Sequence, residues 1–133
     1  MDKRYFPVVF FKTASGHEPV REWLRNLNSY ERKTIGEDLK TVQFGWPLGM
    51  PLIKKIEPGL WEVRSRLTNK ISRVIFTVID ENIILLHGFI KKSQKLLADD
   101  LRIARQRLND VHKSFNAHQG VRYEKQTSRH KSG

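Results

Sequence analysis

The stretch LWEVRSRLTNKISRVIFTVIDENIILLHGFIK, residues 60–91, decides the fold of this chain. It consists of three runs rich in β-branched and aromatic residues, separated by the turn-forming segments Thr68-Asn69-Lys70 and Glu81-Asn82. Connections this short place consecutive strands side by side and antiparallel. The sequence therefore predicts an antiparallel sheet with strands at Leu60–Leu67, Ile71–Asp80 and Ile83–Lys91.

Two further strands are expected before this stretch. Tyr5–Lys12 has the β-branched and aromatic composition of a strand, and Leu52–Glu57 has a similar pattern. Pro7 favours an edge position for the first of them, because proline lacks the amide hydrogen that a central strand must donate. The complete sheet is thus predicted to have five strands, with Tyr5–Lys12 at one edge.

Three helices are expected around the sheet. Glu18-Pro19 opens the first, since proline is tolerated in the first helical turn. Asn28 caps the second, with Glu31 three residues later in the position that a capping box uses. Apolar residues spaced at threes and fours predict the last helix, from about Ala98 to His112. Residues 1–115 are therefore predicted to form one α+β domain with a mostly antiparallel sheet.

The end of the chain has a different composition. Residues 116–133, NAHQGVRYEKQTSRHKSG, are polar, basic and without apolar periodicity. A segment of this kind has too little apolar surface to bury against a core. We therefore expect a basic, disordered tail after the domain.

The chain is strongly basic. Lysine and arginine total 25 against 14 aspartate and glutamate residues, which gives a formal net charge of +11 and a pI near 10.2. A positive field of this size in a small domain favours polyanionic partners, above all nucleic acid. The bland alternative is a basic surface that only keeps the protein soluble.

Several classes of protein are disfavoured by what the sequence lacks. The chain has no cysteine, which excludes disulfides, thiol catalysis and cysteine-based metal sites. Its apolar runs are far shorter than the roughly 20 residues that a membrane helix needs. No amphipathic basic helix with an aromatic face stands out either. We therefore expect a cytoplasmic protein that does not bind membranes.

The alternation of residues along the Leu60–Leu67 strand points two arginines to one face. Glu62, Arg64 and Arg66 alternate with apolar residues that face the other way. The next strand adds Arg73 among mostly apolar neighbours, where an unpaired charge costs several kcal/mol. Two interpretations fit: an ion pair with Glu62 or Asp80, or a guanidinium that grips a phosphate with two parallel hydrogen bonds.

A second concentration of positive charge lies where the last strand ends. Lys91 and Lys92 leave the sheet there, and Lys54 and Lys55 on an earlier strand extend the basic surface. Trp46, in the glycine- and proline-rich loop that precedes Leu52, offers a ring on which an unstacked base can lie. The pattern indicates a phosphate-binding surface, with a ring available for an unstacked base.

Other chemistries find little support in the sequence. The five histidines, including His87, are scattered, and none forms a ligand pair with a carboxylate at metal spacing. No phosphate-binding P-loop, dinucleotide fingerprint or serine-nucleophile motif is present. We therefore expect neither a metal nor a cofactor.

Three linked blocks resemble one toxin family. GLWEVR, SRVIFTVID and HGFIKKSQK, followed by a helix, resemble the phage-derived branch of the RelE/HigB toxins of type II toxin–antitoxin systems. The resemblance spans roughly Val8–Leu108. It implies a RelE-like fold, in which two N-terminal helices pack on a curved, mostly antiparallel sheet and a C-terminal helix is added. Leu96-Leu97 departs from the polar residue and proline that often precede this helix, which puts only the helix start in doubt.

The resemblance also implies an activity. Such toxins are endoribonucleases, or mRNA interferases, which cleave mRNA without a metal, typically on the ribosome. The 2′-hydroxyl would attack the adjacent phosphate, leaving a cyclic phosphate and a 5′-hydroxyl. The catalytic residues by similarity are Arg64, Arg73 and Lys91. We expect the arginines to stabilise the phosphorane and Lys91, in a dense positive cluster, to exchange protons. The RNA-binding candidates are Lys54, Lys55, Arg66, His87, Lys92 and Trp46, with a structural role favoured for His87.

Two other functions fit the same sequence. One is a non-enzymatic poison of DNA gyrase of the ParE kind on the same fold, for which phosphate chemistry is unnecessary. The other is a plain nucleic-acid-binding module, which predicts salt-sensitive binding without cleavage. If the chain is a toxin, the resemblance implies mRNA and the ribosome as targets and a cognate helix-turn-helix antitoxin of the HigA kind as partner.

Overall fold

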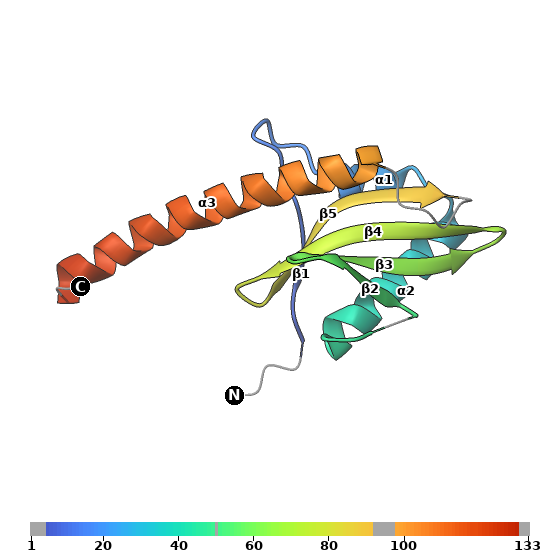
Figure 1. Ribbon diagram of the computed structural model, residues 1–133, viewed down its shortest axis with the longest axis horizontal. Helices are drawn as coiled ribbons and strands as arrows, with labels where there is room; N and C mark the ends of the chain where they lie inside the picture. Colours follow the sequence, from blue (N-terminus) through green and yellow to red (C-terminus); the bar gives the residue numbers. More distant parts are fainter. Residues whose placement is uncertain (1–4, 50, 92–97, 131–133) are drawn as a thin grey trace.

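A computed structural model describes residues 5–49, 51–91 and 98–130. The chain forms an α+β fold with a five-stranded sheet (Figure 1). In chain order the elements are β1 (Val8–Phe10), α1 (Pro19–Arg25), α2 (Ser29–Gly45), β2 (Ile53–Glu57), β3 (Leu60–Leu67), β4 (Lys70–Ile79), β5 (Asn82–Lys91) and α3 (Ala98–His130).

The sheet confirms the strands predicted from residue 52 onwards to within one residue at each end. Its strand order is β1-β5-β4-β3-β2, so the hairpins β2–β3, β3–β4 and β4–β5 are antiparallel neighbours. The edge position predicted for the first strand is also confirmed. β1 is shorter than predicted and pairs in parallel with β5, Val8 lying opposite Ile83. The sheet is therefore mixed, with one parallel pair.

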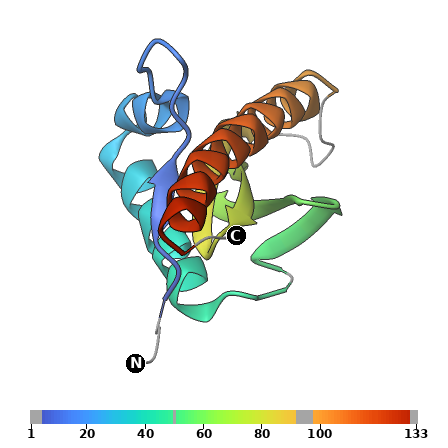
Figure 2. The same ribbon diagram turned by 90° about the vertical axis from the view of Figure 1, so that its left-hand side faces the viewer.

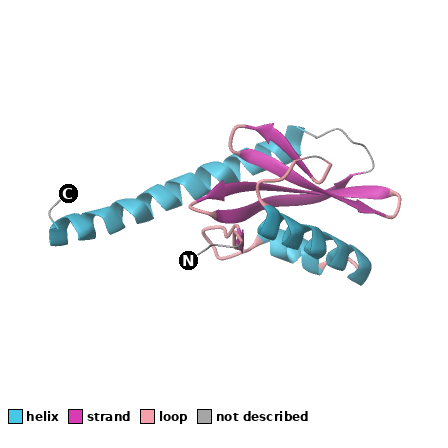
Figure 3. Cartoon of the chain, turned by 90° about the horizontal axis from the view of Figure 1, so that it is seen from below, coloured by secondary structure: helices cyan, strands magenta, loops and turns pink. Residues whose placement is uncertain are grey.

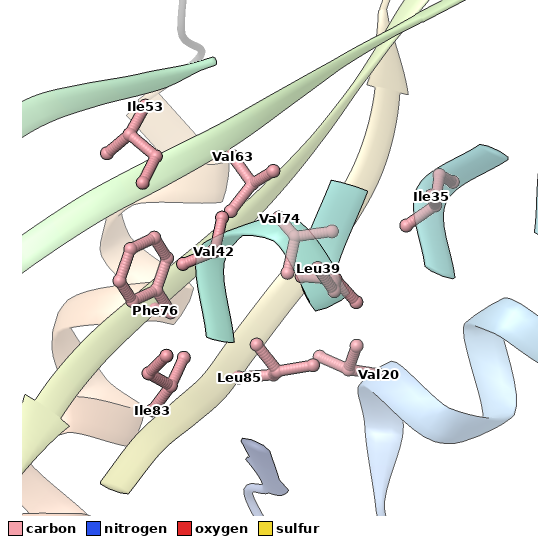
Figure 4. Packing of buried hydrophobic residues seen from close by; sticks show 10 residues of the cluster. All are labelled: Val20, Ile35, Leu39, Val42, Ile53, Val63, Val74, Phe76, Ile83 and Leu85. Carbon is pink, nitrogen blue, oxygen red and sulfur yellow. The ribbon is translucent and has the colours of Figure 1, made fainter. Parts of the chain in front are cut away.

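Helices α1 and α2 pack together on one face of the sheet (Figure 3). Val20 of α1 and Leu39 and Val42 of α2 are buried against Val74 and Phe76 of β4 (Figure 4). The capping box predicted at the start of α2 is present, with the Glu31 amide donating to Asn28 Oδ1 at 2.8 Å. Hydrophobic burial and a satisfied helix start together fix α2 on the sheet.

Helix α3 lies on the opposite face and runs obliquely across the view in Figure 2. Ala104, Leu101 and Leu108 pack there against Ile75 and other buried residues of the sheet. The helix then continues beyond the sheet edge to His130, so the predicted end near His112 is wrong (Figure 1). The sequence from His112 to His130 has no proline and contains many good helix formers, so the helix can continue there without an apolar stripe. The division at residue 115 into a domain and a basic tail stays a prediction.

No helix within the described part of the chain is long and apolar enough to cross a membrane.

Candidate phosphate-binding site

The strand register places the predicted arginines on the α3 face of the sheet. Arg64 of β3 lies opposite Arg73 of β4, and Arg73 lies opposite Phe89 of β5. Ile75, two residues along β4, lies between Glu62 and His87. Since residues opposite each other in a sheet share a face, these side chains form two adjacent rows across three strands, on one face. We call Glu62, Arg64, Arg73 and His87 the charged row.

Glu62 is the centre of the charged row. Its Oε1 lies 3.7 Å from Arg73 Nη1 and its Oε2 lies 3.9 Å from Arg64 Nε. The side chains of Glu62 and Arg73 are each 2% exposed, whereas that of Arg64 is 16% exposed. The ion pair between Arg73 and Glu62 that the sequence allowed is therefore present. Both distances exceed hydrogen-bond length, and the two guanidinium groups lie near the same carboxylate.

Arg66 and Lys54 extend the positive charge outwards. Lys54 lies opposite Glu62 on β2, and Arg66 lies opposite Ile71 on β4, so both belong to the same face. Both side chains are exposed, and neither has a hydrogen-bond or ion-pair partner within the described ranges. They form a solvated cationic rim around the partly buried Arg64.

His87 has a partner that the sequence did not reveal. Its Nε2 lies 2.8 Å from Oδ1 of Asp100, which comes from the first turn of α3. The ring of Phe89 stacks on the imidazole, with centroids 5.3 Å apart. Because His87 and Asp100 meet only after α3 has packed, no spacing motif in the sequence marks the pair.

The ends of the predicted lysine patch are only partly described. Lys91 is the last residue of β5 and lies opposite Ile71, which places it in register with the charged row. Lys92 lies outside the described residues.

Lys55 and Trp46 lie on the other face, away from the charged row. Lys55 is opposite Trp61 in the β2–β3 pair, and its Nζ lies 6.0 Å from the centre of a Trp61 ring. Trp46 packs edge-on against Trp61 and Phe76, at centroid distances of 5.1 and 5.5 Å. Successive residues of a strand face opposite sides, which separates Lys55 from Lys54. Trp46 is part of the apolar packing under α2, not of the arginine surface.

Helix α3 is attached over the charged face by two arginines. Arg105 forms two hydrogen bonds with the Glu57 carboxylate, at 3.0 and 2.8 Å. These bonds lower the pKa of Glu57 and raise that of Arg105. Arg107 donates to the Leu86 carbonyl at 2.8 Å, and burial lowers the pKa of its guanidinium. The contacts fix the height of α3 above the sheet.

A pocket opens beside Arg64. It has a volume of about 370 Å³ and is lined by Asp38, Pro51, Leu52, Arg64, Arg66 and Ile71. A larger groove of about 940 Å³ lies between β1 and α3 and shares no residue with the charged row; Phe11 and Phe115 are among its lining residues. We associate the smaller pocket with the site because it shares Arg64 with the charged row. Among the described residues, no cluster of three histidine, aspartate or glutamate side chains has the geometry of a metal site.

Comparison with known proteins identifies the family. The model of the family described as Phage derived protein Gp49-like (DUF891) matches residues 22–109, about two thirds of the chain. The match includes α2, all of β2 to β5 and the start of α3, and so the whole charged row. No curated protein matches the chain. The chain belongs to the Gp49-like family of phage-derived proteins, which is a RelE-like, toxin-like family.

Proposed function

We propose that this protein is the HigB-type toxin of a type II toxin–antitoxin pair and that it cleaves mRNA as a metal-independent endoribonuclease. The observation that supports the proposal most is the charged row, where Arg64 and Arg73 both lie against the Glu62 carboxylate on one face of the sheet. Membership of a toxin-like family gives this cationic surface a functional context. The cytoplasm and the translating ribosome are the proposed place of action.

The proposed reaction needs little besides positive charge and a proton carrier. The 2′-oxygen bonds to the adjacent phosphorus while its proton passes to a base. The bond from phosphorus to the 5′-oxygen then breaks, and that oxygen takes up a proton from an acid. Guanidinium groups suit the charge that develops on the phosphorane, because they remain protonated throughout. Lys91 is the proposed proton carrier, since neighbouring positive charge disfavours an ammonium form.

Burial distinguishes the proposed roles of the two arginines. Arg64 is partly exposed and adjoins the pocket, so it is the proposed phosphate ligand. Arg73 is 2% exposed and acts from beneath as a positioning residue. By pairing with Glu62, Arg73 is proposed to hold that carboxylate in place next to Arg64. Arg66 and Lys54 on the exposed rim are proposed to bind the RNA backbone.

The test is an Arg64→Ala variant measured against Arg25→Ala. Arg25 is an exposed arginine of α1 whose side chain has no partner in the described part of the chain, so the control removes the same charge away from the charged row. Purified proteins are incubated with a defined mRNA, with and without ribosomes, and the product ends are identified. We expect Arg64→Ala to lose about 100-fold or more in cleavage rate, as for loss of one oxyanion-stabilising donor. Arg25→Ala should cleave normally.

Two outcomes would overturn the proposal. If folded Arg64→Ala cleaves as fast as Arg25→Ala, the site is misplaced. If the wild-type chain leaves RNA intact but inhibits supercoiling by purified gyrase, it is a ParE-like poison instead.

The proposed partner is a small helix-turn-helix antitoxin of the HigA kind. Co-expression of such a protein from the neighbouring reading frame should restore growth and co-purify with the chain.

A further inference from the structure

We infer that the pocket beside Arg64 binds a guanine base of the RNA and that Asp38 recognises its Watson–Crick edge. This inference rests on the proposed endoribonuclease function and names the base that the same site selects. The pocket volume of about 370 Å³ is sufficient for one unstacked purine. Single-stranded RNA is recognised mainly through bases that leave the stack and enter such pockets.

The pocket exists because the C-terminal part of β3 extends beyond Ile53, the first residue of β2. The first ladder pair of these strands joins Ile53 and Val63, and the Arg64 amide then donates to the Leu52 carbonyl at 2.8 Å. Beyond Arg64 the strand has no ladder neighbour on this side within the described residues. Helix α2 supplies Asp38 across the resulting gap.

The pocket adjoins the proposed phosphate site through one residue. Arg64 both lines the pocket and pairs with Glu62 in the charged row. A nucleotide whose phosphate binds Arg64 therefore has its base within reach of the pocket. Leu52 and Ile71 offer apolar surface to the face of a ring, and the exposed, planar guanidinium of Arg66 can stack on it.

Asp38 indicates which base the pocket accepts. A carboxylate repels phosphate, so its presence in a pocket with two arginines points to a ligand that also donates hydrogen bonds. Asp38 is half-buried and has no hydrogen-bond or ion-pair partner among the described residues. Its two oxygens accept only. Among the four bases, guanine alone presents two adjacent donors, N1–H and the 2-amino group, beside an acceptor, O6, that suits arginine.

The other bases fit this arrangement less well. Adenine and cytosine place a ring-nitrogen acceptor next to their amino group, and uracil flanks its single donor with two carbonyls. Each of them would bring an acceptor against the Asp38 carboxylate. A bidentate contact of this kind discriminates between bases by about tenfold or more.

The experiment compares guanine with inosine, which lacks only the 2-amino group. Short uridine-rich RNAs carry one guanine or one inosine, and 2′-deoxy sugars around it prevent cleavage, so that binding is measured alone. We expect the wild-type chain to bind the guanine RNA about tenfold more tightly. Asp38→Asn, which loses one acceptor and the charge, should bind both RNAs equally. The matched control is Glu37→Gln on the exposed side of α2, which should keep the preference.

The cleavage positions of the same variants in a long mRNA separate this inference from the proposed function. If the wild-type chain cleaves RNA but neither binds nor cuts with any preference for guanine, the inference is wrong and the nuclease stands. A guanine preference that folded Asp38→Asn retains also overturns it. If the chain prefers guanine through Asp38 yet cleaves no RNA, the base pocket stands and the nuclease proposal fails. Thermal melting verifies that both variants fold.

Discussion

The face of the sheet under α1 and α2 and the face under α3 bury very different side chains. Under α1 and α2 the sheet buries an apolar cluster that includes Val63, Val74 and Phe76, with the uncharged Ser65 and Ser72 beside it. Under α3 an apolar cluster around Ile75 adjoins the charged row. Both faces exclude water from the same three central strands, β3 to β5.

The difference supports the proposal that the α3 face carries the chemistry, whereas the face under α1 and α2 serves stability. Burying an apolar cluster away from water stabilises the fold on either face of a sheet. A buried carboxylate or guanidinium is tolerated only while its partner is present, and a pair is often no more stable than two apolar residues of the same volume. Glu62 and Arg73 are therefore costly features that packing alone does not require. Their position next to Arg64 is what a phosphate site would require of them.

The largest effect should come from separating the buried pair. Arg73→Ala leaves the Glu62 carboxylate, which is 2% exposed, without its nearest cation. We expect the free energy of unfolding to fall by about 3–5 kcal/mol, measured by urea denaturation followed by circular dichroism. For this reason loss of toxicity in Arg73→Ala would report on folding, and Arg64→Ala is the better test of the site.

A double variant is the control for this prediction. Glu62→Leu combined with Arg73→Met removes both charges and keeps the volume apolar, so stability should return close to the wild-type value. RNA cleavage should remain low, since the field around Arg64 has changed. If the double variant is as unstable as Arg73→Ala, the cost lies in packing and the contrast between the two faces is overstated.

A smaller effect is expected on the apolar face, at Gly88 of β5. A Cβ placed on Gly88 would overlap the indole ring of Trp23, so α1 packs directly on the strand backbone. Gly88→Ala should cost about 1–3 kcal/mol by overpacking, measured by the same unfolding experiment. Adding Trp23→Leu should restore part of the loss. A fully stable Gly88→Ala variant would show that α1 can shift freely and that this face is less tightly specified than we infer.

The sequence predicted most of the fold because its signals are local. Strand alternation and turn residues gave β2 to β5 within a residue, and Asn28 with Glu31 marked the start of α2. The end of α3 was missed, because apolar spacing stops near Val111 while helix propensity does not.

The candidate site could be predicted only in part. Alternation placed Arg64 and Arg66 on one face, and the register then added Arg73. The sequence pattern could not show that Trp46 packs under α2 or that Asp100 contacts His87, because these contacts join separate elements of the chain. Asp38 was missed for the same reason: a single acid on a helix has no motif until the end of β3 is placed beside it.

The smallest effect should come from an ion pair at the rim of the sheet, where water competes with it. Lys70 Nζ lies 2.8 Å from Glu31 Oε2 and joins the β3–β4 turn to α2. The hydrogen bond from Lys70 holds the pKa of Glu31 below its ordinary value of 4.5. A lowered carboxyl pKa stabilises the fold above that ordinary value, and the contribution is lost as the pH falls through the lowered one.

Lys70→Met should therefore lower the urea midpoint at pH 7 and have a smaller effect at an acidic pH below the lowered pKa of Glu31, where that carboxyl is protonated in both proteins. Its cost at pH 7 should stay well below that of Gly88→Ala, because the Lys70 side chain is 34% exposed and solvent screens the pair. The control is Lys33→Met, which removes an exposed lysine from α2, the helix that carries Glu31. It should leave the urea midpoint unchanged at both pH values. An equal gap between Lys70→Met and the wild-type chain at both pH values would assign the effect to packing rather than to charge. Comparing the loss of stability in Lys70→Met with that in Arg73→Ala shows how much more a carboxylate costs when it loses its cation in a buried site than in an exposed one.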